Sequence, residues 1–270
     1  MNIENKQFFQ DEQLIRVVPA ERYEMKPDEQ HYITKELTKV KLDDDIGEIW
    51  TYPALHLFHG KISEKIVKDV IEHCTNTNND DASGKLVANI EGPQSYLDAD
   101  HPLMKEFVDI MMRSACIFVD QCMMTNPSWE QAQPRRIEIQ EIWDVKMKPG
   151  DYNPLHIHGT KAMQGLSSIC YLKVPDGLHQ AEEEGVMNPK YNYAAKIDGW
   201  LKFLWGIPDH YKFDEFACPT GTHILPKVGD YYIFPKSLNH EVYPFRDNED
   251  RWSVQINFNC WEEGKDGNEY

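Results

Sequence analysis

The triplet His156-Ile157-His158 is the first group of residues in this chain whose types and spacing could do chemistry. On a β-strand, residues two apart point to the same face, so these two imidazoles would lie side by side. Two adjacent imidazoles fill an apolar core poorly, but imidazole is a good ligand for iron, zinc and related metals. The triplet alone is weak evidence, and it predicts a metal site only together with further ligands.

His240 is the candidate for a third ligand. It follows the segment GDYYIFPKSLN, which has the pattern of a turn, a strand and a loop, and it begins another strand, HEVYPF. A histidine at a strand end, beside the mouth of a barrel of strands, can reach a metal ion held by two others. The alternative is a histidine at the surface or in a cap.

The triplet Arg251-Trp252-Ser253 is a candidate anion site. Arg251 and Ser253 share one face of the predicted last strand. The guanidinium group matches a carboxylate with two parallel hydrogen bonds, and the serine hydroxyl adds a donor. The alternative is a surface ion pair between Arg251 and one of the acids close by in sequence, which are Asp247, Glu249 and Asp250.

The order of these groups adds to their separate meaning. The histidine pair and the distant histidine would hold iron(II) on one side and leave its other side open. The arginine and the serine follow later in the chain. A co-substrate could then bind the metal at one end and place a carboxylate on the arginine at the other.

Short strands must position these residues. From residue 137 onward the hydrophobic pattern has period two and is broken by Gly, Pro and Asp turns, which predicts a sandwich or jelly roll. Earlier in the chain, Ser63 is the expected N-cap of a helix over 64–74, and a long helix is expected over 102–124. Helices followed by strands predict the α+β class. The expected strands are 137–148, 154–158, 165–175, 199–206, 222–226, 230–235, 240–245 and 251–260.

These elements predict a domain plan. Residues 1–48 are expected to form an arm. Residues 49–136 are expected to form a helical N-terminal part packed on the core, and a strand could begin within residues 49–59. Residues 137–262 would form the catalytic core and 263–270 a tail. The polar insertion 176–198 could be a lid. Trp200 and Trp205 would either shape access to the site or pack in the core.

Composition narrows the classes of partner. The chain has 270 residues and a formal net charge of -17, which disfavours a nucleic-acid backbone as partner and favours a basic peptide or a small molecule. Its six cysteines form no CxxC pair, as expected for reduced thiols in the cytoplasm. The N-terminus lacks the pattern of a signal peptide, and no apolar run is long enough to span a membrane.

The chain resembles the 2-oxoglutarate/Fe(II) oxygenase superfamily, and within it the prolyl-4-hydroxylase-like group of bacteriophages and marine bacteria. The resemblance lies in WDVKMKPGDYNPLHIH, LSSICYLKVP, DGWLKFLWG and VGDYYIFPKSLNHEVYPFRDNEDRWSVQINFN, and more weakly in LHLFHGKIS. It implies a double-stranded β-helix, a distorted jelly roll with N-terminal helices packed on the larger sheet. If the protein is phage-encoded, its location would be the host cytoplasm.

The resemblance also implies roles for single residues. His156 and His240 would bind Fe(II), while Arg251 and Ser253, with Tyr171 nearby, would hold 2-oxoglutarate. O2 would be the oxidant, ascorbate a supporting reductant, and a prolyl residue in a peptide the substrate.

One position departs from the family pattern, because most members have HxD where this chain has His156-Ile157-His158. His158 is expected to complete the metal site with His156 and His240, and a carboxylate from Asp144 or Asp151 is the alternative. Two other functions stay open at this point: a three-histidine cupin-like dioxygenase without 2-oxoglutarate, and a metal-free jelly-roll binding or virion protein.

Overall fold

The fold is seen in a computed structural model of the chain. The structure describes residues 38–41, 47–52, 55–76, 80–85, 87–125, 136–159, 164–178, 197–205 and 221–261. Most of the predicted N-terminal arm, residues 179–196 of the predicted lid and the predicted tail therefore lie outside the described residues.

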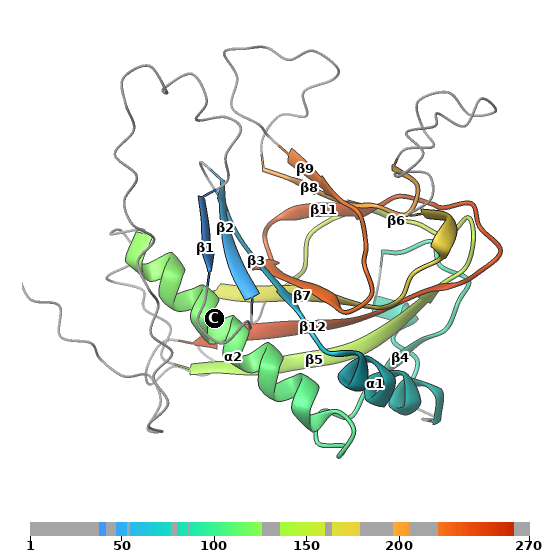
Figure 1. The fold of residues 1–270 in the computed structure, drawn as a ribbon, viewed down its shortest axis with the longest axis horizontal. Helices are drawn as coiled ribbons and strands as arrows, with labels where there is room; N and C mark the ends of the chain where they lie inside the picture. Colours follow the sequence, from blue (N-terminus) through green and yellow to red (C-terminus); the bar gives the residue numbers. More distant parts are fainter. Residues whose placement is uncertain are drawn as a thin grey trace, which may run out of the picture.

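Two antiparallel sheets face each other across the interior (Figure 1). The larger sheet has the order β1-β2-β3-β10-β7-β12-β5-β4, and the smaller has the order β6-β11-β8-β9. The strands of the larger sheet are β1 (Thr38–Lys41), β2 (Gly47–Tyr52), β3 (Leu55–Lys61), β4 (Gln94–Tyr96), β5 (Arg136–Met147), β7 (Gln164–Lys173), β10 (Asp230–Pro235) and β12 (Arg251–Trp261). Those of the smaller sheet are β6 (Asn153–His156), β8 (Leu201–Leu204), β9 (Gly221–Ile224) and β11 (Asn239–Val242).

The strands from β5 to β12 follow a jelly-roll path. The chain passes from one sheet to the other between β5, β6, β7 and β8, and again from β9 to β12. As a result β5 and β12, the first and last of these strands, are neighbours in the larger sheet over their whole length. All eight strands predicted after residue 136 are present, which confirms the sheet-rich, antiparallel character of this part of the chain.

The N-terminal part contributes more strand than its prediction as a helical region suggested. β1, β2 and β3 form a meander that joins the larger sheet through the pairing of β3 with β10. The single strand expected near residues 49–59 is two strands, and β4 pairs with β5 at the other edge of the sheet. β4 was not predicted, because three residues are too few to show an alternating pattern.

Two helices carry apolar side chains that join those of the larger sheet in one core cluster. They are α1 (Glu64–Asn76) and α2 (Lys105–Thr125), close to their predicted positions. The Ser63 hydroxyl accepts a hydrogen bond from the Ile66 amide at 3.4 Å, as expected of an N-cap. Among the described residues, neither helix is long and apolar enough to cross a membrane.

β12 shows how the two faces of the larger sheet differ. Val254, Ile256 and Phe258 point toward the helices and are fully buried in the core cluster. The alternate residues face the interior between the sheets and are polar: Arg251, Ser253, Gln255 and Asn257 all line a cavity there. Because burying polar groups costs free energy unless they find partners, a row of them on a central strand marks a binding site.

Candidate active site

The turn between β5 and β6 sets the position of the first two histidines. Lys148, Pro149, Gly150 and Asp151 form a β-turn closed by a hydrogen bond from the Asp151 amide to the Lys148 carbonyl at 3.0 Å. Gly150 has a φ of 94°, which a glycine adopts without strain at the third position of a type II turn. This turn sends the chain from the larger sheet into β6, which ends at His156.

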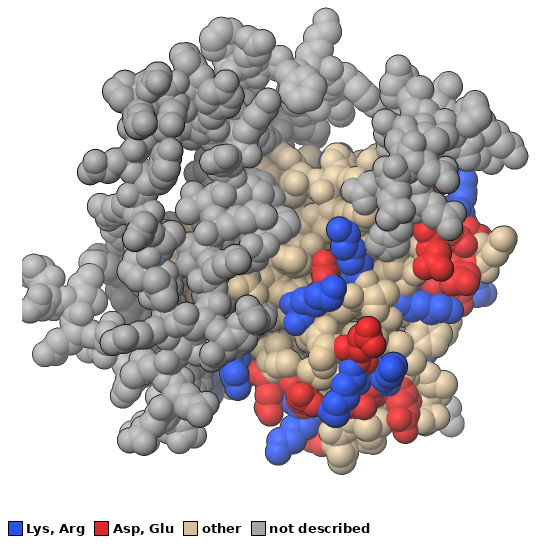
Figure 2. All heavy atoms as spheres, in the orientation of Figure 1, with Lys and Arg blue, Asp and Glu red and all other residues tan. Residues whose placement is uncertain are grey.

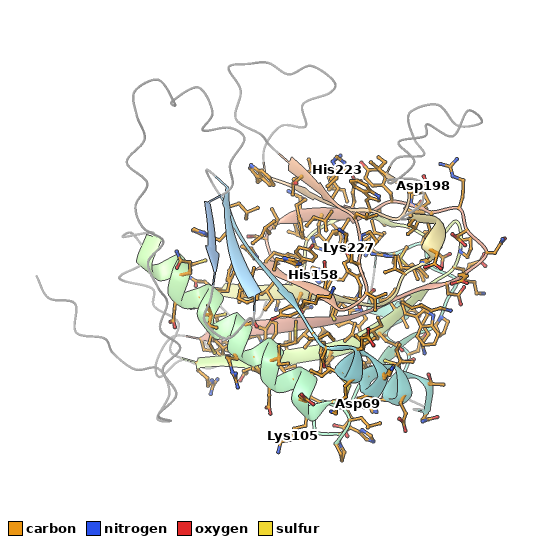
Figure 3. All side chains as sticks on the ribbon, in the orientation of Figure 1. Asp69, Lys105, His158, Asp198, His223 and Lys227 are labelled. Carbon is orange, nitrogen blue, oxygen red and sulfur yellow. The ribbon has the colours of Figure 1, made fainter. Side chains whose placement is uncertain are left out.

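Pairing of β6 with β11 brings His240 to the same place. His156 and His240 are direct partners in the register of these strands. The ring nitrogens of His156, His158 and His240 lie within 4.8 Å of one another, and they form the one such group of histidine, cysteine or carboxylate ligands among the described residues. Figure 3 shows His158 in the interior between the sheets, while Asp69 and Lys105 lie outside on the helices.

Backbone carbonyls orient two of the three rings. The Nδ1 atom of His156 lies 2.7 Å from the Pro154 carbonyl, and that of His240 lies 2.9 Å from the Leu238 carbonyl. A carbonyl can only accept, so each Nδ1 carries the proton and each Nε2 has a lone pair that can accept a hydrogen bond or bind a metal. The Nε2 of His240 lies 3.1 Å from that of His158. The Nε2 of His156 lies 3.4 Å from the Asn153 amide nitrogen, which is its hydrogen-bond donor.

Burial keeps all three imidazoles neutral. Desolvation lowers the pKa of His156, lowers that of His158 to about 3, and lowers that of His240 well below its usual value. The neighbouring histidines lower the pKa of His158 and of His240 further. Neutral imidazole is the form that binds a metal, so the group is ready for one at neutral pH.

These shifts predict a pH dependence of the metal-free protein. Between a pH of about 6.5 and about 3, the unfolded chain binds a proton at His158 that the folded chain does not. We therefore expect its contribution to the free energy of unfolding to fall by about 1.4 kcal/mol per pH unit as the pH drops through this window. Denaturant unfolding of wild type and His158→Asn at several pH values isolates this contribution. An equal pH dependence of the two proteins would contradict it.

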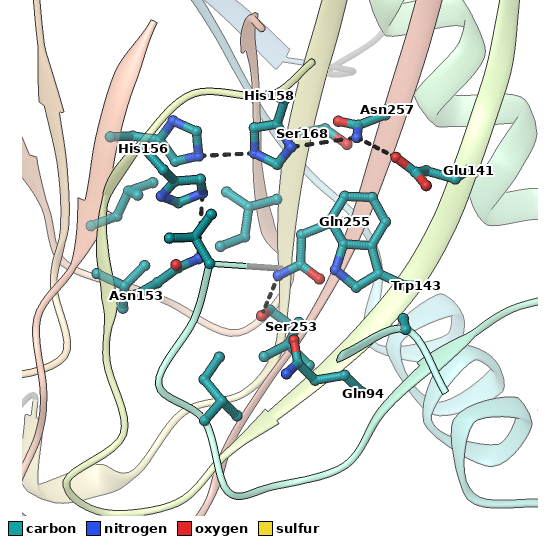
Figure 4. A pocket seen from close by; sticks show the side chains of 18 of the residues that line it. Gln94, Glu141, Trp143, Asn153, His156, His158, Ser168, Ser253, Gln255 and Asn257 are labelled. Carbon is teal, nitrogen blue, oxygen red and sulfur yellow. Dashed lines mark hydrogen bonds between the residues drawn. The ribbon is translucent and has the colours of Figure 1, made fainter. Parts of the chain in front are cut away.

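At the other end of the same cavity lies Arg251. The cavity has a volume of about 650 Å³ and runs between the sheets from the histidines to Arg251 and Ser253. Figure 4 shows this interior from close by, with Ser253 and Gln255 on one side and His156 and His158 on the other. The predicted metal ligands and the predicted anion site therefore share one cavity.

Arg251 is a buried cation without a counter-ion. Its side chain is 1% exposed, and its Nε and Nη2 have no hydrogen-bond partner among the described residues. The remaining nitrogen, Nη1, lies 3.0 Å from the Met147 sulfur. Desolvation lowers the pKa of Arg251, but an arginine remains charged in proteins. The alternative of a surface ion pair is wrong, because the guanidinium group is buried and forms no such pair in the described part of the chain.

Tyr171 lies against this guanidinium group, whose central carbon is 5.0 Å from the centre of the phenol ring. Tyr171 is fully buried and pairs with Ser253 across β7 and β12, although it does not line the cavity itself. Desolvation raises the pKa of Tyr171 to about 12, so it carries a hydroxyl proton. The Tyr171 hydroxyl has no partner in the described chain, which leaves a further donor next to Arg251.

The structure also adds residues that the sequence analysis missed. Glu141, Trp143, Gln255 and Asn257 line the cavity from β5 and β12, and Gln94 lines it from β4. Gln255 and Asn257 could have been found, because they continue the two-residue spacing of Arg251 and Ser253. Gln94 gave no signal, since its position depends on how β4 pairs with β5.

Several other candidates lie elsewhere. Asp151 accepts hydrogen bonds from the Lys148 and Glu91 amides and so braces the turn before β6. Asp144 contacts Lys146 and the Ser95 amide, and neither aspartate lines the cavity. Trp200 and Trp205 pack against the core cluster between the sheets rather than lining the cavity.

The outer surface indicates the function of the protein less clearly than the cavity does. On the described part of the face seen in Figure 2, Lys and Arg side chains are interspersed with Asp and Glu. The net charge of -17 is therefore not gathered into one continuous acidic area on this face. The chemistry of the interior carries the functional argument.

The residues present fit a metal ion and a dicarboxylic co-substrate. Three neutral imidazoles suit iron. At the far end, a buried guanidinium group with two unused nitrogens needs an anion, since an unpaired buried charge costs several kcal/mol.

Fold and cavity together define a jelly-roll protein with a candidate three-histidine metal centre and a separate candidate carboxylate site. Residues 141–257 match the family described as "Putative 2OG-Fe(II) oxygenase". This part of the chain is similar to the 2-oxoglutarate/Fe(II) oxygenase superfamily. The protein is an oxygenase that uses Fe(II), 2-oxoglutarate and O2.

Solved structures similar to this chain include a prolyl-4-hydroxylase from Pseudomonas putida, with 13% identity over 77% of this chain and 94% of that one, at a TM-score of 0.46. A viral collagen prolyl hydroxylase from Paramecium Bursaria Chlorella virus-1, in complex with 2-oxoglutarate, has 16% identity over 76% and 96%, at 0.44. HygX from Streptomyces hygroscopicus, with nickel, 2-oxoglutarate and hygromycin B bound, has 11% identity over 76% and 82%, at 0.45. No curated protein matches the chain. At these low TM-scores the assignment rests on the family match and not on these structures.

Proposed function

We propose that this oxygenase is a hydroxylase in which His156, His158 and His240 hold Fe(II), and Arg251 and Ser253 hold the distal carboxylate of 2-oxoglutarate. The observation that carries the proposal is the buried Arg251, whose Nε and Nη2 are without partners in the cavity that the three histidines share. A three-histidine dioxygenase without 2-oxoglutarate would leave this cation uncompensated.

The jelly-roll path of β5 to β12 supports the double-stranded β-helix as the particular fold. In such a scaffold the inner faces of two central strands, β7 and β12, supply the co-substrate site. Tyr171 and Ser253 are direct partners across this pair, so the hydroxyl groups of both can donate beside the guanidinium group.

The protein residues bind, orient and exclude water. The three imidazoles would hold the metal on one side, and Arg251 would fix how deep the co-substrate lies. Trp143 is 3% exposed and its ring centre lies 6.1 Å from that of His158, so it covers the metal centre on the β5 side. Bound Fe(II) supplies the activation of O2, in which 2-oxoglutarate is oxidised to succinate and carbon dioxide as a substrate C–H bond becomes C–OH.

We propose a peptide or a small molecule as substrate, with a prolyl residue in a peptide as the first to test. The reducing cytoplasm is the proposed location. The protein supplied with Fe(II), ascorbate, 2-oxoglutarate and O2 is expected to form succinate, and a true substrate should raise the rate of succinate formation and gain the mass of one oxygen atom. Mass spectrometry of proline-containing peptides and of metabolite pools measures both. Absence of succinate formation from iron-loaded protein would refute the proposal.

A further inference from the structure

His158 has different surroundings from the other two histidines. The Nδ1 atoms of His156 and His240 donate to backbone carbonyls, whereas the Nδ1 of His158 faces a side chain. That side chain is Asn257, whose Nδ2 lies 3.4 Å from His158 Nδ1. The orientation of His158 therefore depends on a residue that can be exchanged by mutation.

Asn257 is itself held by a carboxylate. Its Nδ2 donates to Oε1 of Glu141 at 2.8 Å, and Gln140 donates to the same oxygen at 3.3 Å. Glu141 and Asn257 are direct partners in the register of β5 and β12 and both line the cavity. Figure 4 shows the resulting row from His158 through Asn257 to Glu141.

The carbonyl oxygen of Asn257 has no partner, although Asn257 is only 3% exposed. When Nε2 of a neutral histidine binds a metal, its Nδ1 carries the proton and needs an acceptor. A half-turn of the Asn257 carboxamide exchanges its oxygen and its nitrogen, so it would bring the oxygen to His158 Nδ1, and the Glu141 carboxylate would have to follow Nδ2 to keep its hydrogen bond. The unpartnered oxygen is therefore suited to the metal-bound form of His158.

Charge also singles out Glu141. It is the one carboxylate among the described residues that line the cavity, and Arg251 is the one Lys or Arg. Lys236 is buried near by, but its ammonium group donates to Gln140 at 2.6 Å and to Asn259 at 3.1 Å. It forms no ion pair with Glu141 in the described chain, although the negative charge of Glu141 opposes the lowering of the Lys236 pKa by burial. The hydrogen bonds to the carboxylate come from the amides of Gln140 and Asn257.

We propose that Glu141, acting through Asn257, is the outer carboxylate of the metal centre. This proposal rests on the proposed function, because it requires that His158 be a metal ligand. Glu141 is a positioning residue: it holds Asn257, Asn257 orients the His158 ring, and the pair places a negative charge two side chains from the metal. A neutral histidine at position 158 brings no such charge itself.

The test is anaerobic titration of the purified chain with Co(II), whose visible absorption reports the ligand set. Loss of an outer partner of a metal ligand costs about 10- to 100-fold in metal affinity, and we expect this loss for Glu141→Gln. The matched control is Glu138→Gln on the same strand. Glu138 accepts a hydrogen bond from the Trp261 indole at 2.6 Å and does not line the cavity, so wild-type affinity is expected.

A charge swap separates positioning from folding. The double variant Glu141→Gln, Asn257→Asp moves the carboxylate onto His158 and leaves an amide behind it, so it should recover most of the Co(II) affinity and the wild-type absorption. If Glu141→Gln does not fold, the double variant alone tests the proposal. Weak Co(II) binding by this double variant would overturn the proposed role of Glu141.

Failure of the inference and failure of the proposed function give different results. If wild type binds Co(II) and Glu141→Gln binds it as tightly as Glu138→Gln does, the inference is overturned and the proposed metal site stands. If wild type does not bind Co(II), both are overturned.

Discussion

Replacing His156 or His240 by alanine is expected to weaken Fe(II) binding by more than about 100-fold, a larger loss than removal of an outer-shell partner causes. The two residues are direct register partners on β6 and β11, and each holds its ring proton on Nδ1 through a backbone hydrogen bond, which leaves the Nε2 lone pair available to a metal. Loss of either leaves two imidazoles, which grip a metal weakly. Anaerobic Fe(II) titration with calorimetric or optical detection gives the affinity.

His223→Ala is the matched control for these variants. His223 lies on β9 of the same small sheet, is exposed and stacks on Tyr243, and does not line the cavity. It should bind Fe(II) as wild type does. Unchanged stoichiometry and affinity in both His156→Ala and His240→Ala would show that the metal, if bound, is held elsewhere.

Arg251→Lys is expected to lower the affinity for 2-oxoglutarate by about 10- to 100-fold, since a hydrogen bond to a charged group contributes about 1.5–3 kcal/mol. Lysine keeps the charge but loses the planar fork that matches a carboxylate. Fe(II) affinity should stay the same, because Arg251 is not a ligand. Titration of 2-oxoglutarate into the Fe(II)-loaded protein under nitrogen, followed by its visible charge-transfer band, measures the change.

Two controls separate co-substrate binding from structure. Arg246→Lys makes the same chemical change at an exposed arginine that pairs with Asp198, and it should leave the titration unchanged. A 2-oxoacid without the distal carboxylate should not distinguish wild type from Arg251→Lys. A wild-type titration curve for Arg251→Lys would show that 2-oxoglutarate does not bind at this end of the cavity.

Arg251→Met should raise the melting temperature of the protein without co-substrate, because it removes an uncompensated buried charge.

The local elements were open to prediction because their signals lie within a few residues. The helix at 64–76 followed from a Ser63 cap and a three- and four-residue apolar spacing, and the strands after residue 136 followed from period two. β4 and the division between β2 and β3 were missed. β4 is an edge strand of the larger sheet and exists through its pairing with the distant β5, and β3 is joined to the sheet by the distant β10, so local propensity alone did not show them.

For the candidate site, the residue types and their order were readable in the chain, and the distances were not. Strand geometry predicted a shared face for His156 and His158 and for Arg251 and Ser253, although β6 ends at His156 and His158 lies just beyond it. Whether Arg251 is at the surface or buried could not be read, because the neighbouring acids in the sequence favoured a surface ion pair for this arginine taken alone. Arg251 is buried because β12 lies in the centre of the larger sheet, between β5 and β7.

By itself, therefore, the sequence determined which side chains could bind a metal and a carboxylate, the α+β class, and the family resemblance. The tertiary structure alone decided that His240 meets His156, that one cavity joins the histidines to Arg251, and that Glu141 and Asn257 stand behind His158. The physical reason is register. Which strand pairs with which, and at what offset, depends on burying two sheet faces at once over the whole chain, and no short segment contains that information.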